Sequence, residues 1–182
     1  MRFYSWSLGC TVVKLLNIFV DICLLRAGPQ DLPASRFLLG VALLLGLLTG
    51  ALVIVNSFGS VFSALLAQIL DLLLLMALIR FGLAYRGLAP RFLQVATALF
   101  GSSVLINLVT MPVQLLIGED PSASLAGELG VLLYLFLLVW ALVVIGHILR
   151  HGFDIRFGGG ILIALAYFLL INWLVQTFFT VA

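Results

Sequence analysis

The chain has 182 residues, of which 64% are hydrophobic and 9% are charged. Soluble domains carry about 25% charged residues because their surface faces water, so this composition excludes a soluble protein. The formal net charge is +2 and no basic run occurs, which excludes nucleic acid as a partner. We therefore expect an all-α integral membrane bundle that forms a single transmembrane domain over residues 1–182.

The first predicted element is an amphipathic helix over residues 8–25. Its polar residues are spaced so that they share one narrow stripe of a helix: Cys10, Lys14, Asn17 and Asp21. We interpret this element as a helix that lies in the membrane interface, with Phe3, Tyr4 and Trp6 anchoring its start. The alternative is a sixth span whose polar stripe faces the bundle.

Five later runs are apolar enough and long enough to cross a bilayer, which requires about 20 residues. They cover residues 37–56, 61–83, 91–117, 124–149 and 161–181. Pro112 lies inside the third span and is expected to kink or break its helix near the far end. Asp120 and Pro121 suit the cap and the first position of a helix. The Gly158–Gly160 run is interpreted as a flexible segment that leads into the last span.

The basic residues indicate the orientation in the membrane. With five spans, all nine fall on one side: Arg2, Lys14, Arg26, Arg36, Arg80, Arg86, Arg91, Arg150 and Arg156. The other side receives Glu119, Asp120 and Glu128. The positive-inside rule then predicts a cytoplasmic N-terminus and an outside C-terminus. We expect the membrane to be a bacterial inner membrane. A six-span arrangement would move only Arg2 across. The basic side should favour anionic lipid head groups.

Small residues recur along the first span, where Ala42, Gly46 and Gly50 are four residues apart. Such a face allows another helix to approach closely. Packing inside the same bundle is favoured over homodimerisation.

An acid, Asp71, lies near the midpoint of the second span. A charge at that depth costs about 2.5–3.5 kcal/mol on insertion scales, so the acid needs partners. The other spans offer uncharged polar groups near the same level, and we predict one buried polar cluster: Gln68, Asp71, Ser102 or Ser103, Asn172 and also Asn107. Because no Lys or Arg lies at that depth, we expect a protonated, hydrogen-bonded acid. The cluster is interpreted as interhelical hydrogen bonding, and a proton- or cation-linked site is the alternative.

No pattern predicts catalysis, a cofactor or a metal. His147 and His151 are four residues apart, which is favoured as an ordinary helix-end pair over a metal site. Neither HExxH nor a Ser and His pair at matching depth occurs. Cys10 and Cys23 have no CxxC spacing and are expected to be unpaired and structural.

The segment Tyr134–Phe178 resembles the last two spans of the Yip1 family of small polytopic membrane proteins. It contains YLFLLVWALVVIGHILRHGFDIRFGGGILIALAYFLL, with Trp140 in a span, a short basic loop and a small-residue start to the final span. LLRAGPQDLPASRFLLG, Leu24–Gly40, is similar to the opening of related bacterial membrane proteins. The resemblance implies five spans, a cytoplasmic N-terminal segment and an outside C-terminus. Eukaryotic members act in membrane traffic, but the resemblance implies the fold more than that function.

Two functional hypotheses follow. The favoured one is a non-enzymatic scaffold or accessory subunit that acts through helix contacts and the basic loops. Its partners would be the lipid bilayer and another membrane protein or a second copy of the chain. The alternative is a small proton- or ion-linked transporter or channel component that uses Asp71.

Overall fold

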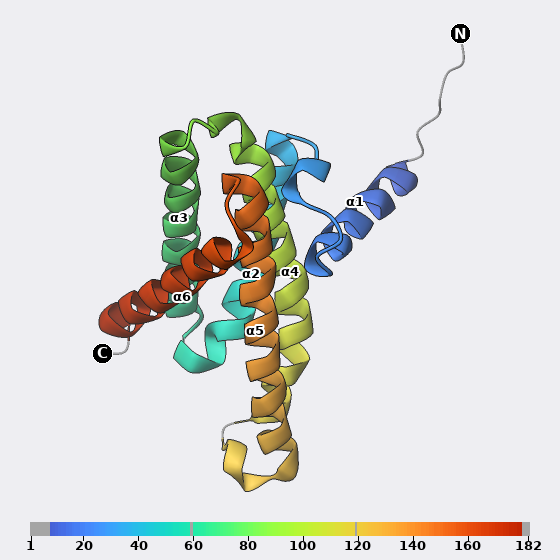
Figure 1. Ribbon diagram of the computed structural model, residues 1–182. Helices are drawn as coiled ribbons and strands as arrows, with labels where there is room; N and C mark the ends of the chain where they lie inside the picture. Colours follow the sequence, from blue (N-terminus) through green and yellow to red (C-terminus); the bar gives the residue numbers. More distant parts are fainter. Residues whose placement is uncertain (1–7, 59, 119, 180–182) are drawn as a thin grey trace.

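The computed structural model describes residues 8–58, 60–118 and 120–179, and these ranges form helices and no strand (Figure 1). The helices are α1 Leu8–Cys23, α2 Arg36–Phe58, α3 Val61–Tyr85, α4 Phe92–Ile117, α5 Leu125–Phe153 and α6 Phe157–Phe179. Three short 3-10 turns connect them: η1 Pro29–Asp31, η2 Ala89–Arg91 and η3 Pro121–Ala123. Helices α2 to α6 are long and apolar enough to cross a membrane. The predicted all-α bundle with five spans is confirmed.

Helix α4 lies at the centre of the bundle. In its most apolar window 44% of the residues are buried, against 11% in α6. The buried run Val95–Ser102 is rich in small residues, which let neighbouring helices approach on several sides. Helices α2 and α5 make the most extensive contacts with α4. Helix α4 is therefore the central helix against which the other helices pack.

Short connections end the helices with local hydrogen bonds. At Asp120, Oδ1 accepts from the backbone N–H of Ser122 at 3.0 Å and from its hydroxyl at 2.6 Å, and these bonds lower the pKa of the Asp120 carboxyl. Pro121 follows as the first residue of η3. Ser124 then caps α5, because its hydroxyl accepts from the N–H of Gly127 at 3.0 Å. Asp120 and Pro121 thus occupy the positions that the sequence indicated, on η3 rather than on α5.

The start of α6 differs from the prediction. The Gly158–Gly160 run is not a flexible segment, because α6 begins at Phe157 and includes it. The reason is a close crossing with α5. A Cβ atom on Gly160 would overlap the carbonyl oxygen of Gly146, and one on Gly146 would lie 2.8 Å from Cγ1 of Ile161. These glycines serve helix contact rather than chain flexibility.

Pro112 does not break α4, which continues to Ile117. The residue lies one turn and a half before the helix end, so only the far end of the helix is affected by its missing N–H.

Helix α1 lies outside the set of five spans and projects from one side of the bundle (Figure 1). Its C-terminal end packs deeply. Phe19 is buried against Gly101, where a Cβ atom would overlap the phenyl ring. The indole Nε1 of Trp140 donates to the carbonyl oxygen of Cys23 at 3.1 Å. Trp140 lies about 20 Å along the axis from Phe153, the last residue of α5. The end of α1 therefore lies near mid-bundle depth.

Both faces of α1 are exposed outside its packed end. Lys14 and Asn17 belong to the polar stripe, and Val12 and Val13 are the apolar residues that an interfacial helix turns toward lipid. Burial raises the pKa of the Cys23 thiol. The expected anchors Phe3, Tyr4 and Trp6, Arg2 and the side chain of Cys10 lie outside the described residues.

The non-helical segment between α1 and α2 returns along the bundle and is held by three side chains. Trp140 binds Cys23 as above, His147 Nε2 lies 3.0 Å from the carbonyl oxygen of Ala27, and Gln94 Nε2 donates to the carbonyl oxygen of Leu32 at 2.8 Å. Backbone carbonyls at membrane depth need such donors because lipid offers none. The packing of this segment explains why His147, although polar, is buried.

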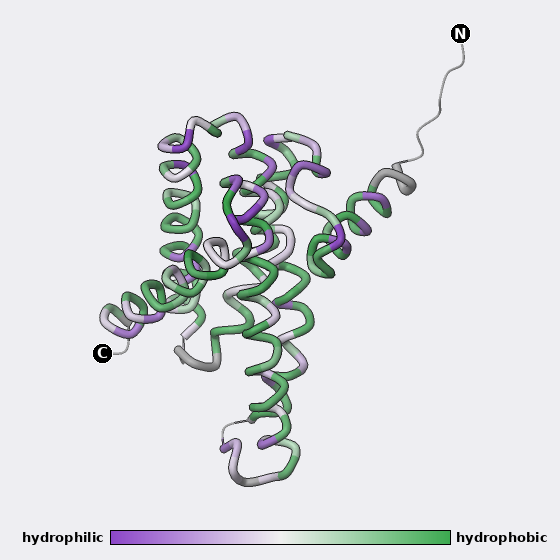
Figure 2. Tube along the Cα trace, in the orientation of Figure 1, coloured by the Kyte–Doolittle hydropathy of each residue, from purple (hydrophilic) through white to green (hydrophobic). Residues whose placement is uncertain are grey.

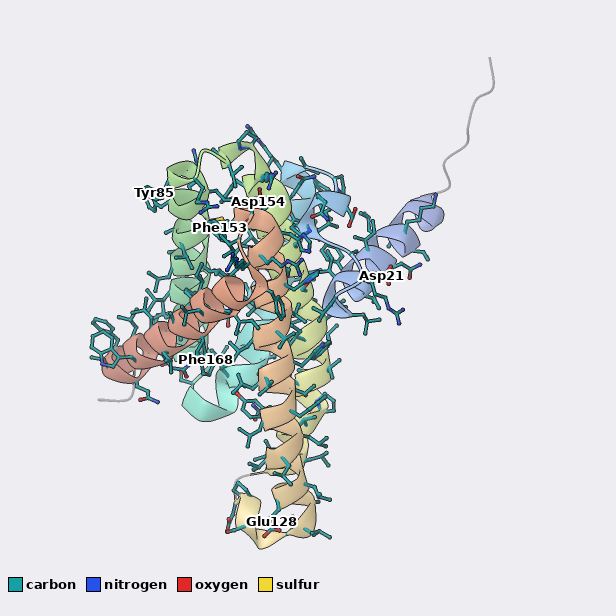
Figure 3. All side chains as sticks on the ribbon, in the orientation of Figure 1. Asp21, Tyr85, Glu128, Phe153, Asp154 and Phe168 are labelled. Atoms are coloured by element: carbon teal, nitrogen blue, oxygen red, sulfur yellow. The ribbon has the colours of Figure 1, made fainter. Side chains whose placement is uncertain are left out.

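Polar residues gather at one end of the bundle. Figure 2 shows hydrophilic segments where the chain enters α2, joins α3 to α4 and joins α5 to α6, whereas the spans are mainly hydrophobic between their ends. Tyr85 and Asp154 lie at this end and Glu128 lies at the opposite one (Figure 3). The basic residues Arg86, Arg91 and Arg156 belong to the same connections. We call it the basic end.

Candidate intramembrane acid site

A cavity of about 600 Å³ lies among the five spans, and residues of α2, α3, α4, α5 and α6 all line it. Its wall is mainly apolar and aromatic, with side chains such as Phe100, Tyr134 and Phe168. All six residues of the predicted polar cluster line this cavity: Gln68, Asp71, Ser102, Ser103, Asn107 and Asn172. We call it the central cavity.

Asp71 binds a residue that the predicted cluster did not contain. The hydroxyl of Tyr167, on α6, donates to Oδ1 of Asp71 at 2.6 Å and lies 2.8 Å from its carbonyl oxygen. On the same helix as Asp71, Gln68 Nε2 donates to Oδ2 at 3.4 Å. Both carboxyl oxygens thus face neutral donors. The bond from Tyr167 also joins α3 to α6.

This arrangement suits two protonation states of the acid. As a carboxylate, Asp71 receives one hydrogen bond on each oxygen, although no Lys or Arg lines the cavity. As a neutral acid, it can donate its proton to the amide oxygen of Gln68 after that amide rotates, because the two ends of an amide exchange roles by rotation. The geometry of the site therefore allows Asp71 to gain or lose a proton while it stays hydrogen-bonded to Tyr167 and Gln68.

The remaining cluster residues line the cavity without binding Asp71. Asn107 Nδ2 donates to the hydroxyl of Thr49 at 3.2 Å, and the Ser103 hydroxyl donates to the carbonyl oxygen of Phe100 at 2.7 Å. The buried hydroxyl of Ser102 lies beside the Cys23 thiol and has no well-formed hydrogen bond to any described residue. Within the described residues, these hydrogen bonds do not join the six members of the predicted polar cluster to one another. Its members share a cavity rather than a network.

Asn172 is the clearest error. Its side chain is exposed and donates to the carbonyl oxygen of Phe168, one turn earlier on its own helix, at 2.8 Å. The depth estimate placed the start of the last span at residue 161, which moved its midpoint toward Asn172. With the start at Phe157, Tyr167 lies near the middle of α6. A correct start for this helix would have selected Tyr167.

The small residues of α2 pack inside the bundle. Ala42 is buried against α4 with Ala96 and Phe100. A Cβ atom on Gly46 would lie 3.5 Å from the Ser103 hydroxyl, in ordinary contact, but one on Gly50 would lie 2.5 Å from Oε1 of Gln68. Gly50 therefore provides the space for the amide that binds Asp71.

The two histidines contact each other and the segment that precedes α2. His147 uses Nε2 for the carbonyl oxygen of Ala27, and its ring meets that of His151 edge to face at 4.7 Å. Among the described residues, no group of three His, Cys, Asp or Glu side chains could hold a metal ion.

Comparisons of the chain with protein-family models, with curated proteins and with solved structures found no match.

Proposed function

We propose that this integral membrane protein is a non-enzymatic, proton- or cation-linked transporter or channel component, with Asp71 as the group that binds the proton or cation. The observation that carries the proposal is the central cavity, which all five spans line and which contains the bonded pair Asp71 and Tyr167. An acid within a membrane span is costly, and such acids often mark ion or proton pathways.

The surroundings of Asp71 support this role over interhelical hydrogen bonding alone. A purely structural acid needs only its partners, yet this one borders a space of about 600 Å³. Its partners are a phenol and an amide, which can remain bonded while the acid gains or loses a proton. No base lines the cavity to neutralise it permanently.

Flux through reconstituted vesicles tests the proposal. Purified protein in proteoliposomes with an internal pH-sensitive dye, under an imposed pH gradient and potassium potential, should dissipate the gradient faster than empty vesicles. Asp71→Asn keeps the size and hydrogen bonding of the side chain but cannot ionise, so it should reduce the flux to the background. Tyr167→Phe should reduce the flux partially, because only one donor is lost.

The matched control is Glu128→Gln, which also replaces an acid by its amide. Glu128 is exposed in the first turn of α5, away from the central cavity, so its replacement should leave the flux unchanged. Equal flux for the unmodified protein and Asp71→Asn would overturn the proposal.

A second candidate, a scaffold or accessory subunit, is favoured by the surface of α6. This helix is the least buried of the spans and exposes Trp173, together with Asn172 at the edge of the central cavity. An exposed polar side chain on a span gains stability from hydrogen bonds to a neighbouring membrane helix. Stoichiometric co-purification of one identified membrane protein in mild detergent, reduced by Asn172→Leu but not by Leu162→Ala, would support this candidate.

We also propose the orientation and the relationship to other proteins. The membrane would be a bacterial inner membrane. The basic residues favour an orientation with the basic end in the cytoplasm, where the loops would attract anionic lipids. Single-cysteine labelling from each side, at Ser35 and at Ser124, tests this orientation, because only Ser35→Cys should react from the cytoplasmic side. The likeness of residues 134–178 to the Yip1 family supports a Yip1-like assignment.

A further inference from the structure

A second cavity, of about 440 Å³, lies at the basic end of the bundle, apart from the central cavity. Residues from three places in the chain line it: the η1 turn, the start of α4 and the end of α5. We call it the end cavity. Helices α4 and α5 contribute to both cavities, but no residue lines both of them.

The end cavity carries more nitrogen donors than the protein itself uses. Arg91 and Arg150 both line it. Arg91 Nη1 donates to the carbonyl oxygen of His151 at 3.4 Å, which occupies one of its five N–H groups. Arg150 is exposed, and within the described ranges no hydrogen bond or ion pair involves its guanidinium group.

One acid, Asp154, lies among the lining residues, and its backbone carbonyl oxygen accepts from the guanidinium of Arg86 at 3.3 Å. Asp31 does not line the cavity, but its charge acts on His151, which does, and its Oδ2 accepts from the backbone N–H of Gly28 at 2.8 Å. The lining residues themselves include two arginines and one acid, an excess of one positive charge.

The position of the end cavity matches that of lipid head groups. It lies where α4 begins and α5 ends, beside Asp154, and the strongly exposed Tyr85 lies at the same end of the bundle (Figure 3). Exposed tyrosines are typical of the interface between membrane and water. A phosphate group at this depth presents several oxygen acceptors, and a guanidinium binds two of them at once.

We propose that the end cavity binds a phosphate group between Arg91 and Arg150, carried by an anionic phospholipid or by a small soluble anion. The site is independent of Asp71 and of the proposed transport.

Lipid retention tests the proposal. The purified full chain in detergent is titrated with phosphatidylglycerol, and retained lipid is read by native mass spectrometry. Diacylglycerol, which lacks the phosphate, is the probe for binding through the acyl chains alone. The unmodified protein should retain phosphatidylglycerol at least about tenfold more strongly than diacylglycerol, because charge-assisted hydrogen bonds are lost with the phosphate.

Arg150→Gln is the first variant, since it removes no hydrogen bond or ion pair within the described residues and should fold normally. It should lower the retention of phosphatidylglycerol about tenfold, and Arg91→Gln should act in the same direction. Arg156→Gln is the matched control, because Arg156 is exposed at the same end but does not line the cavity. It should change retention less than about twofold.

Inorganic phosphate distinguishes the two sources. If millimolar phosphate displaces the lipid, the site serves a soluble anion, and if it does not, the site serves a lipid head group. Equal losses in Arg150→Gln and Arg156→Gln would overturn the proposal, as would equal retention of diacylglycerol and phosphatidylglycerol.

Discussion

The two cavities of this protein differ in the charges that they contain. The central cavity holds one acid, Asp71, with neutral donors around it and no base. The end cavity holds two arginines, Arg91 and Arg150, and one acid. The first lies between the middles of the spans and the second lies where spans end.

Depth explains this difference. At the ends of the spans, water and lipid head groups solvate a guanidinium, so an arginine without a protein partner costs little. In the middle, a charge costs several kcal/mol, so an acid persists only with donors such as Tyr167 and Gln68. The acid in the middle of this protein thus has a donor on each carboxyl oxygen, whereas Arg150 at the end has no protein partner within the described residues.

Filling the central cavity should have the largest effect on stability. Gly50→Leu would drive its side chain into the position of the Gln68 amide and displace it from Asp71. We expect a loss of about 3 kcal/mol in the free energy of unfolding, from overpacking and the lost hydrogen bond, measured by titration with a denaturing detergent. Phosphatidylglycerol retention in the end cavity should be unchanged.

The control for this change lies on the same helix. A Cβ atom on Gly40 would meet no other atom within 4 Å, so Gly40→Leu should be neutral or should stabilise α2 by up to about 1 kcal/mol. Equal destabilisation by both variants would show that the space at Gly50 has no special role.

Loosening the segment between α1 and α2 should have a smaller effect on stability, and it should affect the end cavity but not the central cavity. His147→Phe removes the partner of the Ala27 carbonyl oxygen, two residues before the η1 turn that lines the end cavity. We expect a loss of about 1–2 kcal/mol in the free energy of unfolding and weaker lipid retention, with unchanged flux. His147→Gln, which keeps an N–H donor, should restore part of both. A loss of flux in His147→Phe would contradict the separation of the two cavities.

Removing an arginine from the end cavity should have the smallest effect on stability. Arg150→Leu eliminates an exposed charge without a protein partner within the described residues, so the free energy of unfolding should change by less than about 0.5 kcal/mol. The same detergent titration measures it. A loss above 2 kcal/mol would mean that Arg150 stabilises the fold rather than serving a ligand.

Much of the fold could be predicted because the spans are defined by local composition. Runs of apolar residues and polar connections placed the first three spans close to their observed bounds, and the fourth at its start. The error at Gly158–Gly160 arose because three glycines resemble a flexible segment, whereas their role is a close crossing with Gly146. That role depends on a helix distant in sequence.

The candidate site was only partly predictable for the same reason. The depth of Asp71 follows from the ends of its own helix. The free-energy cost of a charged side chain at that depth identifies Asp71 as a residue that needs hydrogen-bond partners. The choice of partner depends on how α6 crosses α3, and a shift of one turn in the start of α6 exchanges Asn172 for Tyr167. Likewise, the end of α1 can pack at mid-bundle depth only because Gly101 has no side chain, which leaves room for the ring of Phe19.

The sequence by itself determined that this chain belongs in a membrane, that five of its helices are long enough to cross one, and that Asp71 needs uncharged partners. These properties follow from the composition and length of each segment and from the position of Asp71 within its own helix, so they do not depend on how the helices pack. Only the tertiary structure decided that Tyr167 is the hydrogen-bond partner of Asp71 and that the other polar residues line the central cavity. It also decided that Arg91 and Arg150 line the end cavity together. These depend on helix crossings, which small residues such as Gly50, Gly101 and Gly160 permit and which no single segment specifies.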